Sequence, residues 1–137
     1  MKSPTVLIVD DDKIVHLVLA QILKDFDCNA IYSDNGAKAL EIARELRPEL
    51  VITDALLPGL DGRELAHALK ADPDTAHCKV AVITGLYKGV RYRAEAVKRF
   101  SVDAYLEKPL KVDQIRALIS SVTPAIGDTQ PSLALVV

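Results

Sequence analysis

Hydrophobic and polar positions follow two patterns along this chain, one typical of buried strands and one typical of helices. Five short runs predict strands, because a parallel strand that is buried on both faces is almost continuously apolar. They are residues 5–9, 28–32, 50–53, 79–83 and 102–106. Between them, apolar residues recur at helical spacing. The predicted helices are residues 13–26, about 36–47, 61–71, about 90–100 and 112–122.

Turn and capping residues separate these segments. Asp12 is placed to cap the first helix, and Asp61 followed by Glu64 resembles a capping box at the start of the third. Pro48 marks the end of the second helix. Because βαβ crossovers are almost always right-handed, five strands alternating with five helices predict an α/β fold with a doubly wound parallel sheet.

Length and composition restrict the class of protein. The 137 residues suggest one domain, and 50% hydrophobic with 26% charged residues indicates a folded globular chain. The net charge of -2 gives no global indication of nucleic acid or an anionic membrane. No apolar stretch reaches the roughly 20 residues of a membrane span. The N-terminus runs directly into a strand and shows no signal peptide, so we expect a cytoplasmic protein with two reduced thiols, Cys28 and Cys78.

Polar residues follow four of the predicted strands. They are Asp10, Asp11 and Asp12 after the first, Asp54 at the end of the third, Thr84 after the fourth and Lys108 after the fifth. The carboxyl ends of parallel strands meet at one edge of the sheet, where open α/β sheets bind ligands. These side chains are therefore expected to gather in one crevice.

The acidic residues of this set predict a cation site. In a sheet ordered 2-1-3-4-5, the first and third strands are neighbours about 4.8 Å apart. Carboxylates brought so close repel one another, and a hard cation such as Mg²⁺ relieves that repulsion. The alternative is that Asp10 to Asp12 only cap the first helix. Capping explains one of these three aspartates and leaves Asp54 unexplained.

The remaining residues suit phosphoryl chemistry. A carboxylate such as Asp54 can act as a nucleophile and form an aspartyl phosphate. The Thr84 hydroxyl could donate a hydrogen bond to a phosphoryl oxygen, and the Lys108 ammonium could stabilise its charge. Taken singly, Thr84 is also explained by a local hydrogen bond and Lys108 by a solvated surface position. Their common place at the strand ends favours a shared site.

These residues resemble the receiver domain of two-component response regulators. The matching motifs are Leu7-Ile8-Val9-Asp10-Asp11-Asp12, Val51-Ile52-Thr53-Asp54 with Pro58-Gly59 and Asp61-Gly62, Val82-Ile83-Thr84, and Asp103-Ala104-Tyr105-Leu106-Glu107-Lys108-Pro109. The resemblance covers about residues 4–122. It implies a flavodoxin-like fold with the strand order 2-1-3-4-5, a receiver domain over residues 1–122, and a tail or linker over residues 123–137.

The resemblance also implies a role for each site residue. Asp54 would accept a phosphoryl group, and Thr84 and Lys108 would assist the transfer. The expected Mg²⁺ ligands are Asp11 directly, Asp10 through water, Asp54, and the backbone carbonyl of Leu56. Thr84 and Tyr105 would form the switch, with Tyr105 turning inward as Thr84 moves towards the phosphate. The Lys108-Pro109 bond would be cis.

Three departures from the family pattern concern the region of the switch. Gly85 stands where the family usually has Ala, which predicts more room and a looser loop. The segment from Thr84 to Lys108 is about two residues longer than usual, and the extra length is expected within residues 85–90. Leu56 and Leu86 flank the phosphate approach, and neither can position a water molecule by hydrogen bonding. We therefore predict slow self-hydrolysis of the aspartyl phosphate.

The expected partners follow from the same resemblance. A histidine kinase or histidine phosphotransferase would supply the phosphoryl group. A downstream protein or a second copy would read the face formed by the fourth helix, fifth strand and fifth helix. A basic segment around the fourth helix forms either a partner surface or a solvated helix face. It contains Lys88, Arg91, Arg93, Lys98 and Arg99, with Tyr87 and Tyr92 among them. Direct binding of nucleic acid is not expected, since the receiver accounts for nearly all of the chain.

The resemblance implies a phosphoacceptor and not an enzyme. Two other functions compete with this prediction. One is a pseudo-receiver that binds partners without being phosphorylated, although all the site residues are present. The other is a Mg²⁺-dependent phosphohydrolase with an aspartate nucleophile. Such an enzyme needs a general acid near Asp54, and Leu56 cannot serve as one. We expect the apolar residues 133–137 to pack on the domain or on another chain.

Overall fold

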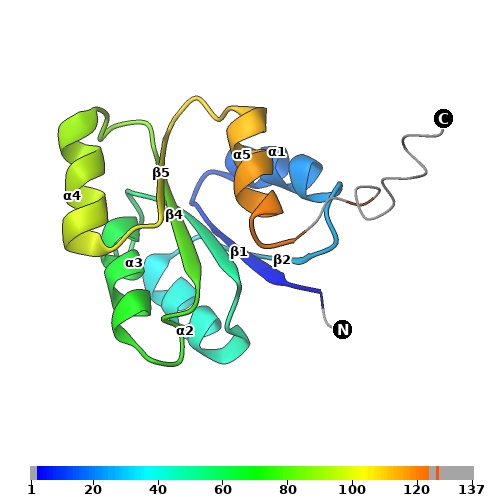
Figure 1. The fold of residues 1–137 in the computed structure, drawn as a ribbon, viewed down its shortest axis with the longest axis horizontal. Coiled ribbons are helices and arrows are strands. Elements are labelled where there is room, and N and C mark those ends of the chain that lie inside the picture. Colours follow the sequence, from blue (N-terminus) through cyan, green and yellow to red (C-terminus); the bar gives the residue numbers. More distant parts are fainter. Residues whose placement is uncertain (1–2, 124–125, 127–137) are drawn as a thin grey trace.

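The structure is a computed structural model that describes residues 3–123 and residue 126 (Figure 1). Five strands alternate with five helices along the described chain. The strands are β1 (Thr5–Val9), β2 (Asn29–Ser33), β3 (Leu50–Asp54), β4 (Lys79–Thr84) and β5 (Ala104–Glu107). The helices are α1 (Lys13–Leu23), α2 (Gly36–Leu46), α3 (Gly62–Ala71), α4 (Val90–Phe100) and α5 (Val112–Ser120).

The strands form one parallel sheet in the order β2-β1-β3-β4-β5, which confirms the predicted topology. Because β1 lies between β2 and β3, and β3 between β1 and β4, three loops that carry site residues emerge side by side. Val9 pairs with Thr53 across β1 and β3, and Thr84 pairs with Glu107 across β4 and β5.

The sheet is buried on both faces, as the continuous apolar strands predict. Successive side chains of a strand point to opposite faces, so Val6 and Ile8 belong to one core cluster and Leu7 and Val9 to the other. Helices α1 and α5 cover the first face, and α2, α3 and α4 cover the second (Figure 1). All four of these β1 side chains are fully buried.

Several element ends differ from the predicted ones. Helix α1 ends at Leu23 rather than at residue 26, because the Asp25 and Phe26 amides donate to carbonyls three residues back and tighten the chain. Strand β2 begins and ends one residue later than expected, and α5 ends at Ser120 rather than at residue 122.

Strand β5 begins at Ala104, although the apolar pattern predicted residue 102. Ser101 adopts a left-handed conformation with φ of 60°, and the Val102 amide donates to the Ala96 carbonyl at the end of α4. Val102 therefore closes the helix. The Asp103 amide then donates to the Val80 carbonyl of β4 at 2.9 Å, and Asp103 Oδ2 accepts from the Val80 amide at 2.8 Å.

Helix α3 is tightly fitted against the end of β3. The Gly62 amide donates to the Ala55 carbonyl at 2.8 Å, and a Cβ on Gly62 would overlap the Asp54 carbonyl oxygen. The close approach therefore requires a residue without a side chain. It joins the first turn of α3 to the end of β3, where the predicted phosphorylation site Asp54 lies.

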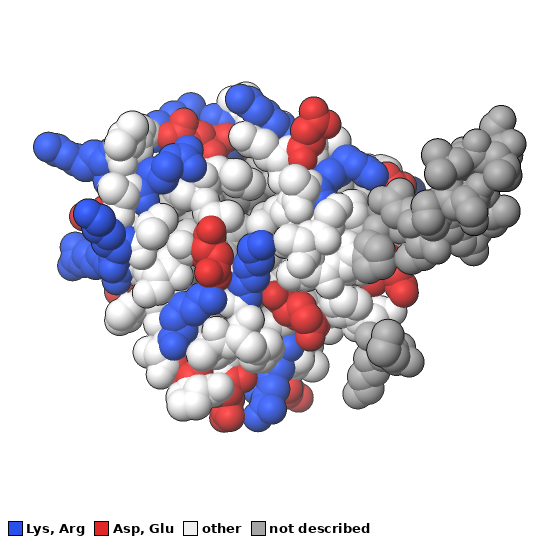
Figure 2. Space-filling view, in the orientation of Figure 1, with Lys and Arg blue, Asp and Glu red and all other residues white. Residues whose placement is uncertain are grey.

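The surface of the described chain carries both charges. Lys and Arg side chains are most concentrated at the end of the molecule formed by α4 (Figure 2). No helix among the described residues has the length and apolar character needed to cross a membrane. Both cysteines are free thiols, and burial raises the pKa of Cys78 to about 11. Residues 133–137, which we expect to pack on the domain or on another chain, lie outside the described part.

Candidate functional site

Three carboxylates meet at the carboxyl edge of the sheet. Asp10 and Asp11 follow β1, and Asp54 ends the neighbouring strand β3. One oxygen atom of each lies within 4.8 Å of the others. The Asp10 amide donates to the Ser33 carbonyl at 3.0 Å, which extends the β1–β2 pairing and directs the chain across the sheet edge. The predicted acidic cluster is therefore assembled by adjacent parallel strands.

The donor atoms of this cluster fit a hard divalent cation. Carboxylate oxygens are preferred ligands of Mg²⁺, which usually keeps several waters. Asp10 is only 2% exposed, whereas Asp11 is exposed. Burial is the largest cause that raises the pKa values of Asp10 and Asp54, and at Asp10 the charges of Asp54 and Asp11 add to it. Hydrogen bonds and Lys108 oppose these effects without reversing them. A crowded, partly buried set of carboxylates is the environment that a cation stabilises.

Lys108 brings a positive charge to the same carboxylates. Its Nζ lies 3.6 Å from Asp10 Oδ2 and 3.5 Å from Asp54 Oδ2. The Lys108 amide donates to the Thr84 carbonyl at 2.7 Å, which extends the β4–β5 pairing to this residue. The Lys108-Pro109 peptide is cis, as the resemblance implied. The solvated position considered for Lys108 is thus excluded, because its side chain is held between two aspartates.

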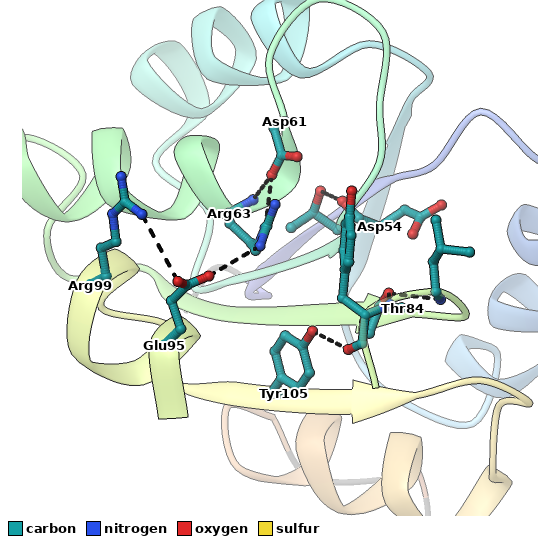
Figure 3. A network of polar contacts seen from close by, with 10 residues as sticks. Asp54, Asp61, Arg63, Thr84, Glu95, Arg99 and Tyr105 are labelled. Atoms are coloured by element: carbon teal, nitrogen blue, oxygen red, sulfur yellow. Dashed lines mark hydrogen bonds and ion pairs between the residues drawn. The ribbon is translucent and has the colours of Figure 1, made fainter. Parts of the chain in front are cut away.

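Thr84 lies at the end of β4 and is 1% exposed. Its Oγ1 accepts hydrogen bonds from the Leu86 amide at 3.1 Å and the Tyr87 amide at 2.9 Å (Figure 3). A hydroxyl has two acceptor positions and one proton. Both acceptor positions serve the loop, and the hydroxyl can still donate its proton. The local hydrogen bonds considered for Thr84 are present, and they do not compete with donation.

Tyr105 lies inward on β5 and is 3% exposed. Its hydroxyl donates to the Tyr87 carbonyl (Figure 3). Burial raises the pKa of Tyr105 and keeps this phenol protonated, as a donor must be. Tyr105 and Thr84 therefore contact the same loop residue.

The loop between β4 and α4 is fixed at several points. Besides the contacts to Tyr87, the Gly89 amide donates to Glu107 Oε2 at 2.7 Å, and Gly89 has a φ of 104°. Arg93 donates to the Tyr105 carbonyl at 2.6 Å. Arg93 therefore has a contact within the domain, although Lys88, Arg91, Arg93, Lys98 and Arg99 are all exposed.

Sequence reasoning missed Arg63. The sequence pattern indicated Asp61 and Glu64 as the helix start. In the structure Asp61 Oδ1 accepts from the Arg63 amide at 2.8 Å and from Arg63 Nε at 3.3 Å. The Arg63 guanidinium also lies 4.5 Å from the centre of the Tyr87 ring. No local pattern connects an arginine on α3 with a tyrosine after β4.

The two apolar residues predicted to flank the phosphate approach are both at the surface. Leu56, in the loop after β3, is 45% exposed, and Leu86, in the loop after β4, is 67% exposed. Each stands two positions after a site residue, Asp54 or Thr84. Neither side chain offers a hydrogen-bonding group to water.

We compared the chain with known protein families to identify the class of protein that has this fold and this site at the strand ends. The sequence model of the response regulator receiver domain matches residues 6–120. The chain belongs to this family. Receiver domains are generally signalling modules of two-component systems rather than enzymes, and they interact with histidine kinases.

Similar proteins span two kinds of architecture. The polar-differentiation response regulator DivK of Brucella anthropi is 28% identical over 90% of this chain and 97% of its own length. Histidine kinase P4 of Formosa agariphila is 32% identical over 88% of this chain, which spans only 9% of that protein. The related sequence therefore occurs both as nearly an entire regulator and as a small part of a kinase.

Solved structures show the same fold. A response regulator from Chloroflexus aurantiacus has a TM-score of 0.78 and 27% identity, covering 88% of this chain and 98% of its own. The receiver domain of a sensor histidine kinase from Pseudomonas aeruginosa has a TM-score of 0.75 and 19% identity, covering 88% and 97%. That second structure has a magnesium ion coordinated in its active site cleft.

Proposed function

We propose that this chain is a phosphoacceptor that receives a phosphoryl group on Asp54 from a histidine kinase or histidine phosphotransferase. One observation carries the proposal: the Asp54 carboxylate is grouped with Asp10 and Asp11 and is also paired with Lys108. A nucleophile, an acidic cation site and an ammonium are the parts that phosphoryl transfer needs, since it depends mainly on positioning and charge stabilisation.

The transfer is a displacement at phosphorus. An Asp54 carboxylate oxygen forms a bond to phosphorus, and the bond from phosphorus to the donor histidine nitrogen breaks. The electron pair of that bond stays on the imidazole, which ends neutral after proton exchange with solvent. Lys108 stabilises the negative charge of the phosphoryl oxygens, and the Thr84 hydroxyl donates a hydrogen bond to one of them.

The acidic cluster would hold Mg²⁺. Its direct ligands would be Asp11, Asp54 and the Leu56 backbone carbonyl, and Asp10 would act through water. A bound Mg²⁺ offsets the negative charge that the phosphoryl group and the carboxylates bring together. Support comes from the oxygen donor set of the cluster and from the magnesium seen in the Pseudomonas aeruginosa receiver domain.

The signal would leave through the face formed by α4, β5 and α5. Tyr105 and Thr84 bind the backbone of the loop that precedes α4, so a change at Asp54 has a short physical path to that helix. The outer surface of α4 is basic and exposes apolar side chains, including Val90 at 83% and Val97 at 52% (Figure 2). This mixture suits a protein partner or a second copy of the chain.

Intact-mass measurement with a small phosphodonor tests the proposal. The protein is incubated with Mg²⁺ and acetyl phosphate, in parallel with Asp54→Asn and with a sample containing a chelator. We expect the wild type to gain one phosphoryl group that the variant and the chelated sample lack. Asp72→Asn is a matched control, because Asp72 lies away from the sheet edge at the end of α3.

The outcomes separate the competing functions. A wild type that gains no mass, with any small donor or kinase, would favour a pseudo-receiver. Continuous release of phosphate from esters, without a stable adduct, would favour a phosphohydrolase. The domain limits at residues 122 and 123 and the expected cytoplasmic location stay predictions.

A further inference from the structure

Arg63 is a largely buried cation between three elements. Its side chain is 17% exposed, and its guanidinium carbon lies 4.5 Å from the Tyr87 ring centre and 5.3 Å from the Phe100 ring centre. It pairs with Asp61 at 3.3 Å and with Glu95 at 3.5 Å (Figure 3). These contacts join the start of α3 to the β4–α4 loop and to α4.

Tyr87 connects this cation to the two switch residues. Its amide donates to Thr84 Oγ1 at 2.9 Å, and its carbonyl accepts from the Tyr105 hydroxyl. Its ring lies beside Arg63 on one hand and 5.3 Å from the Tyr92 ring on the other. The backbone atoms that Thr84 and Tyr105 bind therefore belong to a residue whose side chain is held by Arg63.

An arginine suits this position better than a lysine. The planar guanidinium can lie over an aromatic ring while its N–H groups bind two carboxylates, whereas a lysine ammonium offers only a compact charge. Asp61 caps α3 and Glu95 lies in α4, so the two carboxylates bind the guanidinium from different elements while it lies over Tyr87.

We propose that Arg63 is a positioning residue that holds Tyr87, and through it Thr84 and Tyr105, in the arrangement that accepts a phosphoryl group. The effect of Arg63 on phosphorylation rests on the proposed function, whereas the effect of Arg63 on the Tyr87 loop does not. In the arrangement seen, Tyr105 is inward, and both Tyr105 and Thr84 bind the backbone of Tyr87. Loss of Arg63 lowers the fraction of molecules in that arrangement, and the apparent affinity for a phosphoryl mimic falls by the same factor.

Arg63→Met tests the inference in the 137-residue chain, because methionine keeps much of the packing volume and removes the charge. Two quantities are measured by NMR: hydrogen exchange of the Tyr87 amide without ligand, and the apparent Kd of beryllofluoride with Mg²⁺. We expect exchange to rise about fivefold and binding to weaken about fivefold, with partial recovery in Arg63→Lys. The Val82 amide, inside β4, is the internal reference.

Arg99→Met is the matched control. Arg99 also pairs with Glu95, at 3.9 Å, and lies 5.2 Å from the Phe100 ring, but its side chain is 72% exposed. It shares two partners with Arg63 and lacks the Tyr87 contact. Wild-type exchange at Tyr87 and wild-type beryllofluoride affinity are expected for this variant.

A second variant keeps the test decisive if Arg63→Met does not fold. Tyr87→Leu removes the ring and leaves Arg63 with its carboxylates, and it should reproduce the exchange and binding changes. The proposal is overturned if either variant leaves the Tyr87-position amide and the beryllofluoride affinity as in Arg99→Met. If no protein, including the wild type, binds beryllofluoride, the proposed function fails, while the exchange result alone still decides whether Arg63 holds the loop.

Discussion

Lys108 Nζ lies 3.5 Å from Asp54 Oδ2, so the proposed phosphorylation site faces an ammonium before a phosphoryl group arrives. The lysine side chain is 26% exposed and also approaches Asp10. Its charge is therefore already in place when negative charge develops on the phosphoryl oxygens, and needs no rearrangement at that moment.

Lys108→Met should slow phosphorylation of Asp54 by about tenfold or more, because a preorganised charge at the reacting group is lost. The rate is measured by intact mass after addition of acetyl phosphate. Lys111→Met is the control, since Lys111 is exposed three residues further along. A wild-type rate in Lys108→Met would refute the role of this contact.

Asp10→Asn should stabilise the metal-free protein at neutral pH. Burial raises the pKa of Asp10, so the folded state holds its proton more tightly than the unfolded state. Ionisation of Asp10 therefore disfavours folding. The contribution of Asp10 to the free energy of unfolding falls as the pH rises through the raised pKa. Thermal unfolding should show a higher Tm for the variant above that pH, and a smaller increase of Tm on adding Mg²⁺ than in wild type.

The control for this prediction is the same pair of proteins at a pH below the ordinary range of Asp. Wild-type Asp10 is protonated there, so the difference in Tm should shrink. A variant that is less stable than wild type at neutral pH, or that gains as much from Mg²⁺, contradicts the interpretation of Asp10 as an ionised cation ligand.

The aspartyl phosphate should hydrolyse slowly, and a polar residue at position 56 or 86 should shorten its lifetime. Leu56 and Leu86 are exposed and cannot orient water, whereas an amide could. Leu56→Asn is expected to speed loss of the phosphoryl group by about tenfold, the scale of modest assistance to an attacking water. Leu46→Asn is a matched control, since Leu46 is 46% exposed and Leu56 45%. Equal lifetimes in all three proteins would exclude this explanation.

Two glycines near the site should respond differently to alanine. A Cβ on Gly62 would overlap the Asp54 carbonyl, so Gly62→Ala should reduce the free energy of unfolding by about 2 kcal/mol or more. A Cβ on Gly85 would meet Lys108 Cδ at 3.5 Å, an ordinary contact. Gly85→Ala should therefore change stability by less than about 0.5 kcal/mol. Denaturant unfolding measures both, and similar losses would contradict the difference in packing.

The order of the elements, and the meeting of Asp10, Asp54 and Lys108 at one edge of the sheet, were predictable from the sequence. Strand and helix patterns are local, because side-chain periodicity follows the backbone repeat. The parallel topology then brings strand ends together, which is why Asp10, Asp54, Thr84 and Lys108 could be assigned to one edge. The boundary of β5 was less predictable, since Val102 is apolar and yet closes α4.

Only the tertiary structure decided how these groups are held. The sequence indicated that Lys108 belonged to the site, but its place between Asp10 and Asp54 depends on pairing between β4 and β5. Tyr87 and Tyr105 meet across 18 positions, and Arg63 and Glu95 across 32. Periodicity reports which face of an element is buried. It carries no information on which distant side chain packs there, because that depends on how whole elements dock against one another.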